Sequence, residues 1–183
     1  LKDGTIKINR KNYKEYSIKS LRGKIGYIMQ KVVIFDGTIL ENINYANKDI
    51  SKDKIIEICK KLNLHDKIIS LKDGYETKIS SDTDIFSEGE KQLLNFTRVM
   101  VENPEIIILD EATASLSYKS EMLVRKAIEE ITKGKISFII AHRLSTIKNC
   151  NKILLMKDGK IIEEGTHNEL MNRQGEYYEL VNS

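Results

Sequence analysis

The 183-residue sequence lacks long apolar runs, and it contains only two cysteines, Cys59 and Cys150. Its longest apolar runs, such as 106–109 and 138–141, have the length of a strand, whereas a bilayer-spanning helix needs about 18 apolar residues. The cysteines stand far apart, without the CxxC or Cys/His spacing of a metal or redox site. The sequence therefore predicts no membrane-crossing segment, and it predicts buried free thiols in a reducing compartment.

A strong charge bias is also absent. Thirty basic and 27 acidic residues give a net charge of +3, and the basic residues are spread along the chain rather than gathered in one block. Nothing in this pattern favours nucleic acid as a partner. Without repeats, linkers or low-complexity segments, a chain that is 40% hydrophobic and 31% charged is typical of one globular domain.

Three short apolar runs predict buried parallel strands, because polar or helix-breaking residues bound each of them: 25–29, 106–109 and 137–141. Helical patterns lie between these strands, which predicts an α/β fold. The first two strands are separated by a long, mostly helical insertion. Within it, apolar spacing predicts helices over 51–62 and 88–102.

After the third strand we expect a short helix from residue 145 to 149. Two strands, 152–156 and 161–164, should then form a hairpin around an Asp-Gly turn. The last segment, 166–181, has the apolar spacing of one amphipathic helix.

The strand 106–109 runs directly into two adjacent carboxylates, Asp110 and Glu111. Open α/β sheets bind ligands at the C-terminal ends of their strands. An apolar strand ending in Asp-Glu resembles a Walker B motif, in which the Asp holds Mg²⁺ and the Glu polarises the water that attacks the γ-phosphate. Taken alone, the pair also fits an acidic strand end that only caps the next helix.

Two further side chains follow predicted strands. His142 comes after the third strand, where an imidazole beside the carboxylates suits contact with a γ-phosphate and orientation of the attacking water. Gln30 ends the first strand, and its amide suits Mg²⁺ or a Mg²⁺-bound water. In isolation, His142 also fits a structural role and Gln30 also fits an ordinary loop.

Ser87, Gly89 and Glu90 stand at the start of the predicted helix 88–102. A serine and free backbone N–H groups at a helix N-terminus form an anion site by geometry and dipole. Ser87 and Glu90 are also spaced as a capping box. The two interpretations are compatible, since the cap can hold the turn while the hydroxyl faces outward.

These four elements stand in the order and approximate spacing of an ABC ATPase domain, which the chain resembles over nearly its whole length. Segments that look like the exporter subfamily are 19–30, 35–43, 73–77 and 157–167. The resemblance implies a P-loop NTPase-like α/β core sheet with an inserted helical subdomain, incomplete at the N-terminus. Residues 1–30 would reach the Q-loop, 31–100 would form the helical subdomain with the signature motif, and 101–183 would hold Walker B, the D-loop, the H-loop and the C-terminal hairpin and helix.

The resemblance also implies roles and partners. The ligands would be ATP and Mg²⁺, with Asp110 and Gln30 on the metal, Glu111 as base and His142 on the γ-phosphate. Ser87, Gly89 and Glu90 would serve the ATP of a second nucleotide-binding domain in a head-to-tail dimer. A transmembrane permease domain, fused N-terminally, would hold this soluble domain at the cytoplasmic face of the cell membrane, where ATP hydrolysis powers export.

The sequence departs from the family pattern in several places. The Walker A motif G-x-x-x-x-G-K-[ST] is absent and is expected ahead of Leu1, which stands where a hairpin strand is already under way. The 183 residues alone are therefore expected to bind ATP weakly and to hydrolyse none. Glu88 and Glu90 replace a glycine and a glutamine of the signature, 79–85 lacks the usual Gly-Glu, and Ser117 stands where the D-loop has aspartate.

Two other functions stay open. One is a non-transport ABC ATPase that acts on DNA ends or ribosomes, although such proteins usually carry long coiled-coil insertions or tandem domains, and 30–87 is short. The other is a non-catalytic remnant.

Overall fold

The computed structural model describes residues 4–45, 47, 49–82, 84–110, 117–141 and 143–182. The chain divides into two compact units, Leu1–Ile140 and Ala141–Ser183. The finer division predicted from the motifs, at residues 30 and 100, stays a prediction. Within the described ranges, no helix is long and apolar enough to cross a membrane.

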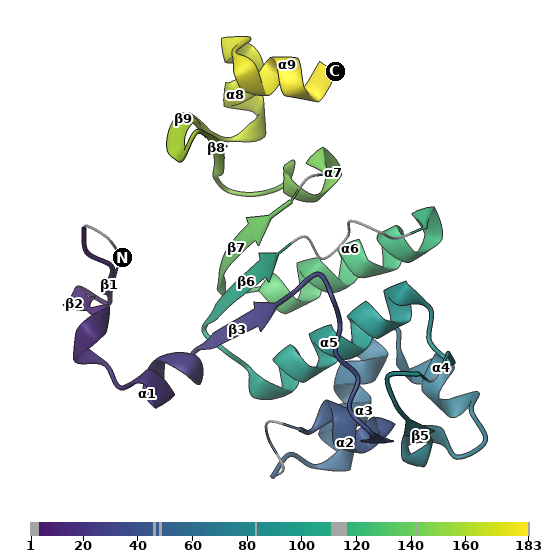
Figure 1. Ribbon diagram of the computed structural model, residues 1–183. Coiled ribbons are helices and arrows are strands. Elements are labelled where there is room, and N and C mark those ends of the chain that lie inside the picture. The colour runs from purple at the N-terminus through teal and green to yellow at the C-terminus, as the bar shows by residue number, and fades with distance from the viewer. Residues whose placement is uncertain are drawn as a thin grey trace. The chain divides into compact units, whose positions relative to one another are not determined.

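The first unit is built on a parallel sheet with the strand order β3-β6-β7 (Figure 1). Its strands are β3 (Ile25–Ile28), β6 (Ile106–Asp110) and β7 (Ile136–Ile140). The register pairs Ile28 with Leu109 and Asp110 with Ile140, so the three carboxyl ends lie at the same edge. The predicted α/β fold is confirmed. The ends of each predicted strand lie within two residues of the observed ends.

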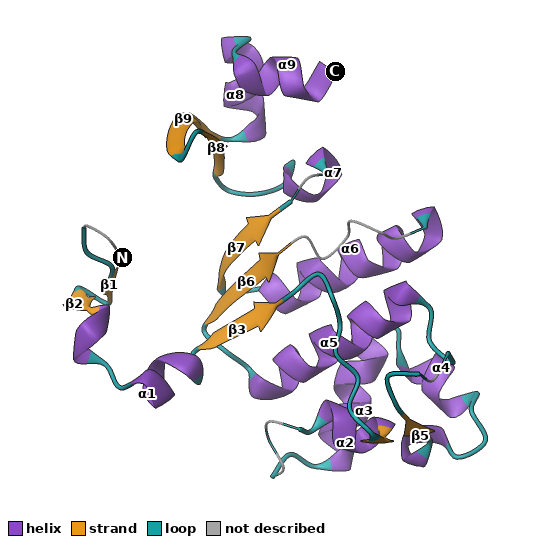
Figure 2. Cartoon of the chain, viewed as in Figure 1, coloured by secondary structure: helices purple, strands orange, loops and turns teal. Residues whose placement is uncertain are grey.

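The two faces of the sheet differ in their cover. On one face, Ile28, Ile107 and Leu109 are buried against two long helices, α5 (Glu88–Glu102) and α6 (Tyr118–Thr132), which lie side by side (Figure 2). On the other face, four side chains are 50–61% exposed: Tyr27, Ile136, Phe138 and Ile140. The prediction of buried strands is wrong for β7, because a parallel strand is buried only when helices cover both faces.

In the helical insertion between β3 and β6, strand β4 pairs antiparallel with β5. The segment between these two strands therefore begins and ends at neighbouring points. Its elements are β4 (Gly37–Thr38), α2 (Ile39–Ile43), α3 (Lys52–Lys61), α4 (His65–Ile69), the 3₁₀ turn η2 (Gly74–Glu76) and β5 (Lys78–Ile79). The predicted helix 51–62 is confirmed as α3, which begins after the N-cap Ser51. Cys59 is a fully buried free thiol within it, and burial raises its pKa to about 11.

Four short elements precede the sheet: β1 (Lys7–Ile8), β2 (Lys11–Asn12), the 3₁₀ turn η1 (Tyr13–Glu15) and α1 (Ile18–Arg22). Asn9 and Arg10 both have positive φ, which is the backbone of a tight hairpin turn between β1 and β2. The strand expected to run through the opening residues is found, among those described, at Lys7–Ile8, where it pairs with Lys11–Asn12.

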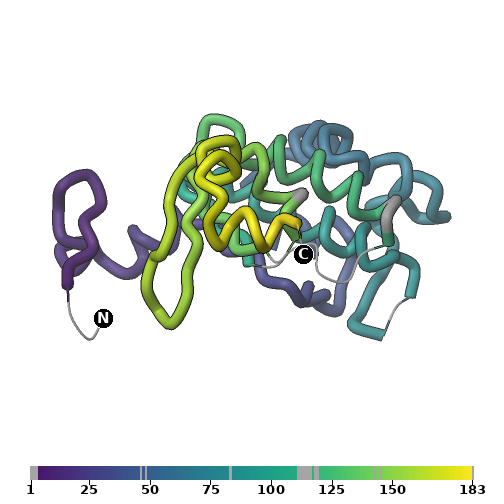
Figure 3. Tube along the Cα trace, turned by 90° about the horizontal axis from the view of Figure 1, so that it is seen from above, coloured from purple at the N-terminus to yellow at the C-terminus, as the bar shows by residue number. Residues whose placement is uncertain are grey.

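The second unit is a hairpin covered by helices. It comprises α7 (Leu144–Ile147), β8 (Ile153–Lys157), β9 (Lys160–Gly165), α8 (His167–Arg173) and α9 (Glu176–Asn182). Ile153, Leu170 and Tyr177 form its small core, and α8 packs against both β9 and α9 (Figure 3). The prediction of one helix over 166–181 is wrong, because Gln174 adopts a left-handed backbone and ends α8 there.

Candidate functional site

Asp110 closes strand β6 and is half-buried. Its Oδ2 accepts a hydrogen bond of 2.9 Å from the Tyr27 hydroxyl, which comes from the neighbouring strand β3. This bond and the nearby carboxylate raise the pKa of Tyr27, since both oppose loss of the phenolic proton. Both side chains therefore meet on the exposed face of the sheet. Glu111, the next residue, lies outside the described residues.

Gln30 follows β3 and therefore lies at the same edge as Asp110. It is exposed, and its backbone carbonyl accepts a hydrogen bond of 2.7 Å from the side-chain amide of Gln92 in α5. His142 follows the neighbouring strand β7 in the sequence, but it lies outside the described residues. The fold thus brings the ends of three strands together, which is what the motif order requires of Gln30, Asp110 and His142.

The start of α5 is a closed capping box. The Ser87 backbone N–H and hydroxyl both donate to the Glu90 carboxylate, each at 2.8 Å, and the Glu90 N–H donates back to the Ser87 hydroxyl at 3.3 Å. Ser87 is exposed at the helix N-terminus. The hydroxyl proton is donated to Glu90 in this structure, but the capping box itself uses the Ser87 hydroxyl only as an acceptor, so the cap and a hydroxyl that donates elsewhere remain compatible.

Gly89 is buried between two helices. A Cβ built on it would lie 2.6 Å from the Ser120 Cβ and 2.9 Å from the Ser120 hydroxyl oxygen. Ser120 in turn donates its backbone N–H to Ser117, the N-cap of α6, and the Ser117 hydroxyl donates to the Ser120 hydroxyl at 3.1 Å. The predicted signature glycine and the predicted D-loop position therefore meet within one chain through Ser120.

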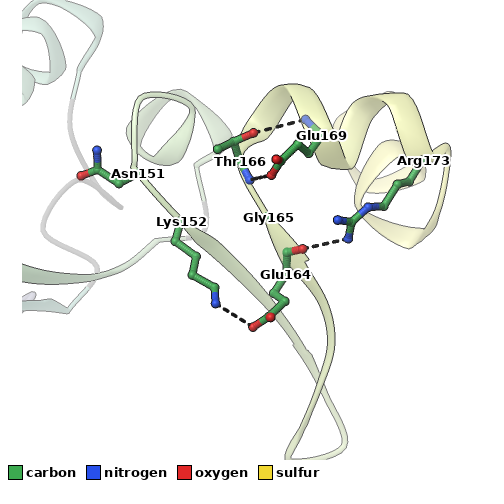
Figure 4. A pocket seen from close by; sticks show the side chains of 7 residues that line it. All are labelled: Asn151, Lys152, Glu164, Gly165, Thr166, Glu169 and Arg173. Atoms are coloured by element: carbon green, nitrogen blue, oxygen red, sulfur yellow. Dashed lines mark hydrogen bonds and ion pairs between the residues drawn. The ribbon is translucent and has the colours of Figure 1, made fainter.

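The second unit contains a hollow of about 300 Å³ (Figure 4). Across it, Lys152 forms an ion pair of 2.9 Å with Glu164, and Arg173 donates to the Glu164 carbonyl at 2.8 Å. The full lining is Asn151, Lys152, Glu164, Gly165, Thr166, Glu169 and Arg173. None of these is a predicted site residue, and Lys152, Glu164, Glu169 and Arg173 all have partners within the lining.

No group of three or more His, Cys, Asp or Glu side chains that could hold a metal occurs in the part of the chain that the structure describes.

Residues 1–114 match the family model described as "ABC transporter". The chain belongs to the ABC transporter family. The predicted resemblance to ATP-binding domains of exporter-type ABC transporters is confirmed, and with it the ATP-binding role of the family.

Relatives in several organisms share this domain. The chain is 42% identical over 98% of its length to ABC transporter B family member 2 of Dictyostelium discoideum. It is 41% identical over 97% of its length to an ATP-dependent lipid A-core flippase of Syntrophus aciditrophicus, and 39% identical over 97% to a fatty acid ABC transporter ATP-binding/permease protein of Mycobacterium bovis. The chain spans 13%, 30% and 28% of the lengths of these ABC transporters, respectively.

Sequence reasoning missed three residues that shape the site of this ABC domain. Tyr27 bonds Asp110, Gln92 bonds Gln30, and Arg98 bonds the carbonyl of Val33 at 2.6 Å. The parallel pairing of 25–29 with 106–109 could have placed Tyr27 on the face of Asp110, because alternate residues share a face. Nothing local signals the two contacts from α5, since they join residues more than 60 positions apart.

Proposed function

We propose that the chain hydrolyses ATP as the nucleotide-binding domain of an exporter-type ABC transporter, and that hydrolysis powers transport across a membrane. The main support is the strand order, because β6 lies between β3 and β7. Gln30, the Asp110–Glu111 pair and His142 therefore follow three neighbouring carboxyl ends, where open parallel sheets bind ligands.

Asp110 and Gln30 fit a magnesium ion. A carboxylate and an amide are hard oxygen donors, which Mg²⁺ prefers, and Asp110 stands on the exposed face where a nucleotide could reach it. We infer that these two residues hold Mg²⁺ directly or through water. When bound, the ion would offset the negative charge of the phosphates.

Glu111 and His142 would act on the water that attacks the γ-phosphate. Glu111 would polarise the attacking water and accept its proton, while His142 would contact the γ-phosphate and hold the water in line. We infer that Ser87 and the N–H groups at Gly89 and Glu90 meet the ATP of a second copy arranged head to tail. The Ser87 hydroxyl must then turn its proton away from Glu90 before it can donate to a phosphate.

The phosphate-gripping Walker A motif is not among the 183 residues, and we assign it to the uncovered face of the sheet. Tyr27, Phe138 and Ile140 line that face, which suits a further strand and helix packed on it. Such a helix would present its N-terminus to phosphates at the strand ends.

A permease domain is the proposed partner, and the cytoplasmic face of a membrane is the proposed location. The Mycobacterium bovis relative is named for both an ATP-binding and a permease part, which supports this arrangement. The names of the relatives mention lipid A-core in one case and fatty acid in another, so the transported substrate is not assigned here.

The decisive experiment changes Glu111 to Gln in the whole protein that contains this chain. We expect ATP hydrolysis to fall at least about 100-fold while ATP binding is kept, because the base is lost and the phosphate contacts are not. Glu105→Gln is the matched control, since Glu105 directly precedes β6, at the strand's other end. Normal hydrolysis by Glu111→Gln would remove Glu111 from the proposed role.

A further inference from the structure

Two side chains of α5 donate hydrogen bonds to the backbone of residues 30–36, which we call the Q-loop segment. Gln92 donates its side-chain N–H to the Gln30 carbonyl at 2.7 Å, and Arg98 donates to the Val33 carbonyl at 2.6 Å. The segment leaves β3 and crosses α5 on its way to β4 (Figure 1). The strand end that carries Gln30 is thus fastened to the helix that starts after Ser87.

Gln92 is 6% exposed, and its two amide atoms are used unequally. The side-chain N–H is bonded to Gln30, whereas Oε1 has no partner among the described residues. Leaving a buried carbonyl oxygen without a partner is unfavourable, and methionine would fill a similar volume without such an atom. The contribution of Gln92 therefore lies in the hydrogen bond that it donates to Gln30.

Arg98 extends the attachment with neutral partners. Besides Val33, its guanidinium donates to the Asn42 backbone carbonyl and to Asn42 Oδ1, both at 2.7 Å, and it lies 5.2 Å from the centre of the Phe35 ring. Asn42 Oδ1 also accepts the Phe35 N–H at 2.9 Å. The Q-loop segment is therefore held at Gln30, Val33 and Phe35, and all three attachments lead to α5.

We propose that Gln92 is a positioning residue that holds Gln30 on α5, so that Gln30 and the N-terminus of α5 move as one body. This rests on the proposed function, in which Gln30 meets the metal of one ATP and Ser87 meets the ATP of the partner. A shift of Gln30 in one nucleotide site then moves Ser87 in the other, and the two sites of a dimer respond together.

The first measurement is hydrogen exchange of the whole protein without nucleotide, comparing wild type with Gln92→Met. The Phe35 amide, which donates to Asn42 Oδ1, should exchange about five- to tenfold faster, because opening of the segment then breaks one hydrogen bond fewer, while α6 keeps its protection. Asn95→Met is the matched control on the next turn of α5, and no hydrogen bond of its side chain is seen in the described residues. That variant should exchange like wild type.

The second measurement is ATP turnover. In Gln92→Met, kcat should fall about five- to tenfold with KM for ATP unchanged, because Gln30 is displaced while the nucleotide-gripping contacts remain. Gln92→Glu adds a pH readout, since a buried carboxyl has a raised pKa and only its protonated form donates a hydrogen bond. Relative to wild type, Gln92→Glu should approach full activity at pH 6 and lose it at pH 8.5, whereas Gln92→Met stays low at both.

Wild-type kcat and wild-type exchange in Gln92→Met would overturn the proposal. So would identical pH profiles for the Met and Glu variants, because the donated hydrogen bond would then be irrelevant. If the wild-type protein itself hydrolysed no ATP, the proposed function would fail, while the exchange measurement would still decide whether Gln92 holds the Q-loop segment.

Discussion

At the scale of single residues, two separate reasons favour glycine at position 89. The family resemblance assigns its backbone to a bound nucleotide, and the fold requires it for the close approach of α5 to α6. A Cβ at this position would lie 2.6 Å from the Ser120 Cβ, which is closer than side chains pack. A loss of activity in a Gly89 variant would therefore not by itself show a phosphate contact.

Gly89→Ala should lower the free energy of unfolding by about 1–3 kcal/mol, because the added methyl group overpacks the interface between the helices. Urea unfolding of the chain measures this. Ser120→Gly removes the opposing Cβ, so alanine at position 89 should be much less costly in that background. If the cost were the same with and without Ser120, the close contact would not be its source.

At the scale of elements, helix ends show what the sequence could predict. The observed bounds of α5 equal the predicted 88–102, because its start and end signals are local: a Ser-x-x-Glu capping box, and Asn103 followed by Pro104. The split between α8 and α9 has a weaker local signal, Gly175 after Gln174, which the prediction of a single helix did not use. The left-handed backbone of Gln174 ends α8, and the Glu163 carboxylate of β9 then stabilises the start of α9 by accepting the N–H groups of Glu176 and Tyr177, each at 3.0 Å.

For the candidate site, too, some features could be predicted from the sequence and others could not. The positions of Gln30 and Asp110 at neighbouring strand ends were predictable, because three apolar runs identify the strands and parallel sheets align their ends. The contacts of Gln92 and Arg98 were not, because they depend on how α5 packs across the insertion. The exposure of one face of β7 was not predictable either, since an apolar run does not show which faces are covered.

Glu163→Ala tests how far the Glu163 carboxylate stabilises the start of α9. Two N–H groups at the start of α9 would lose their acceptor, which should cost about 1–2 kcal/mol of local stability. Hydrogen exchange at Glu176 and Tyr177 is the measurement, and the protection of α5 in the first unit serves as the internal reference. Glu163→Gln keeps an acceptor oxygen and should lose less. Unchanged protection in the alanine variant would show that α9 needs no help from β9.

At the scale of the whole molecule, the exposed apolar face of the sheet determines whether the chain self-associates. Phe138 is 57% exposed on that face, in the edge strand β7 between Ile136 and Ile140. An exposed apolar surface of this kind promotes association. The 183-residue chain alone should therefore associate as its concentration rises.

Phe138→Lys should weaken this self-association about tenfold or more, because a charge replaces a large apolar side chain. Sedimentation velocity over a range of concentrations measures the change. Asn149→Lys adds the same charge at an exposed position of the second unit and should leave association unaltered. A wild-type chain that stayed monomeric at every concentration would contradict this expectation.

The pairing of β4 with β5 has a consequence for how such a domain can diverge. Gly37 pairs with Ile79, so the segment between them begins and ends at adjoining points. Exposed loop residues between them can be lengthened or shortened at little entropic cost, provided that Asn42 still meets Arg98 and that the buried side chains of α2, α3 and α4 keep their places in the core. β3 and β6 meanwhile keep their own ladder of hydrogen bonds. The outer surface of the insertion can therefore change while the strand ends that carry Gln30 and Asp110 stay in place.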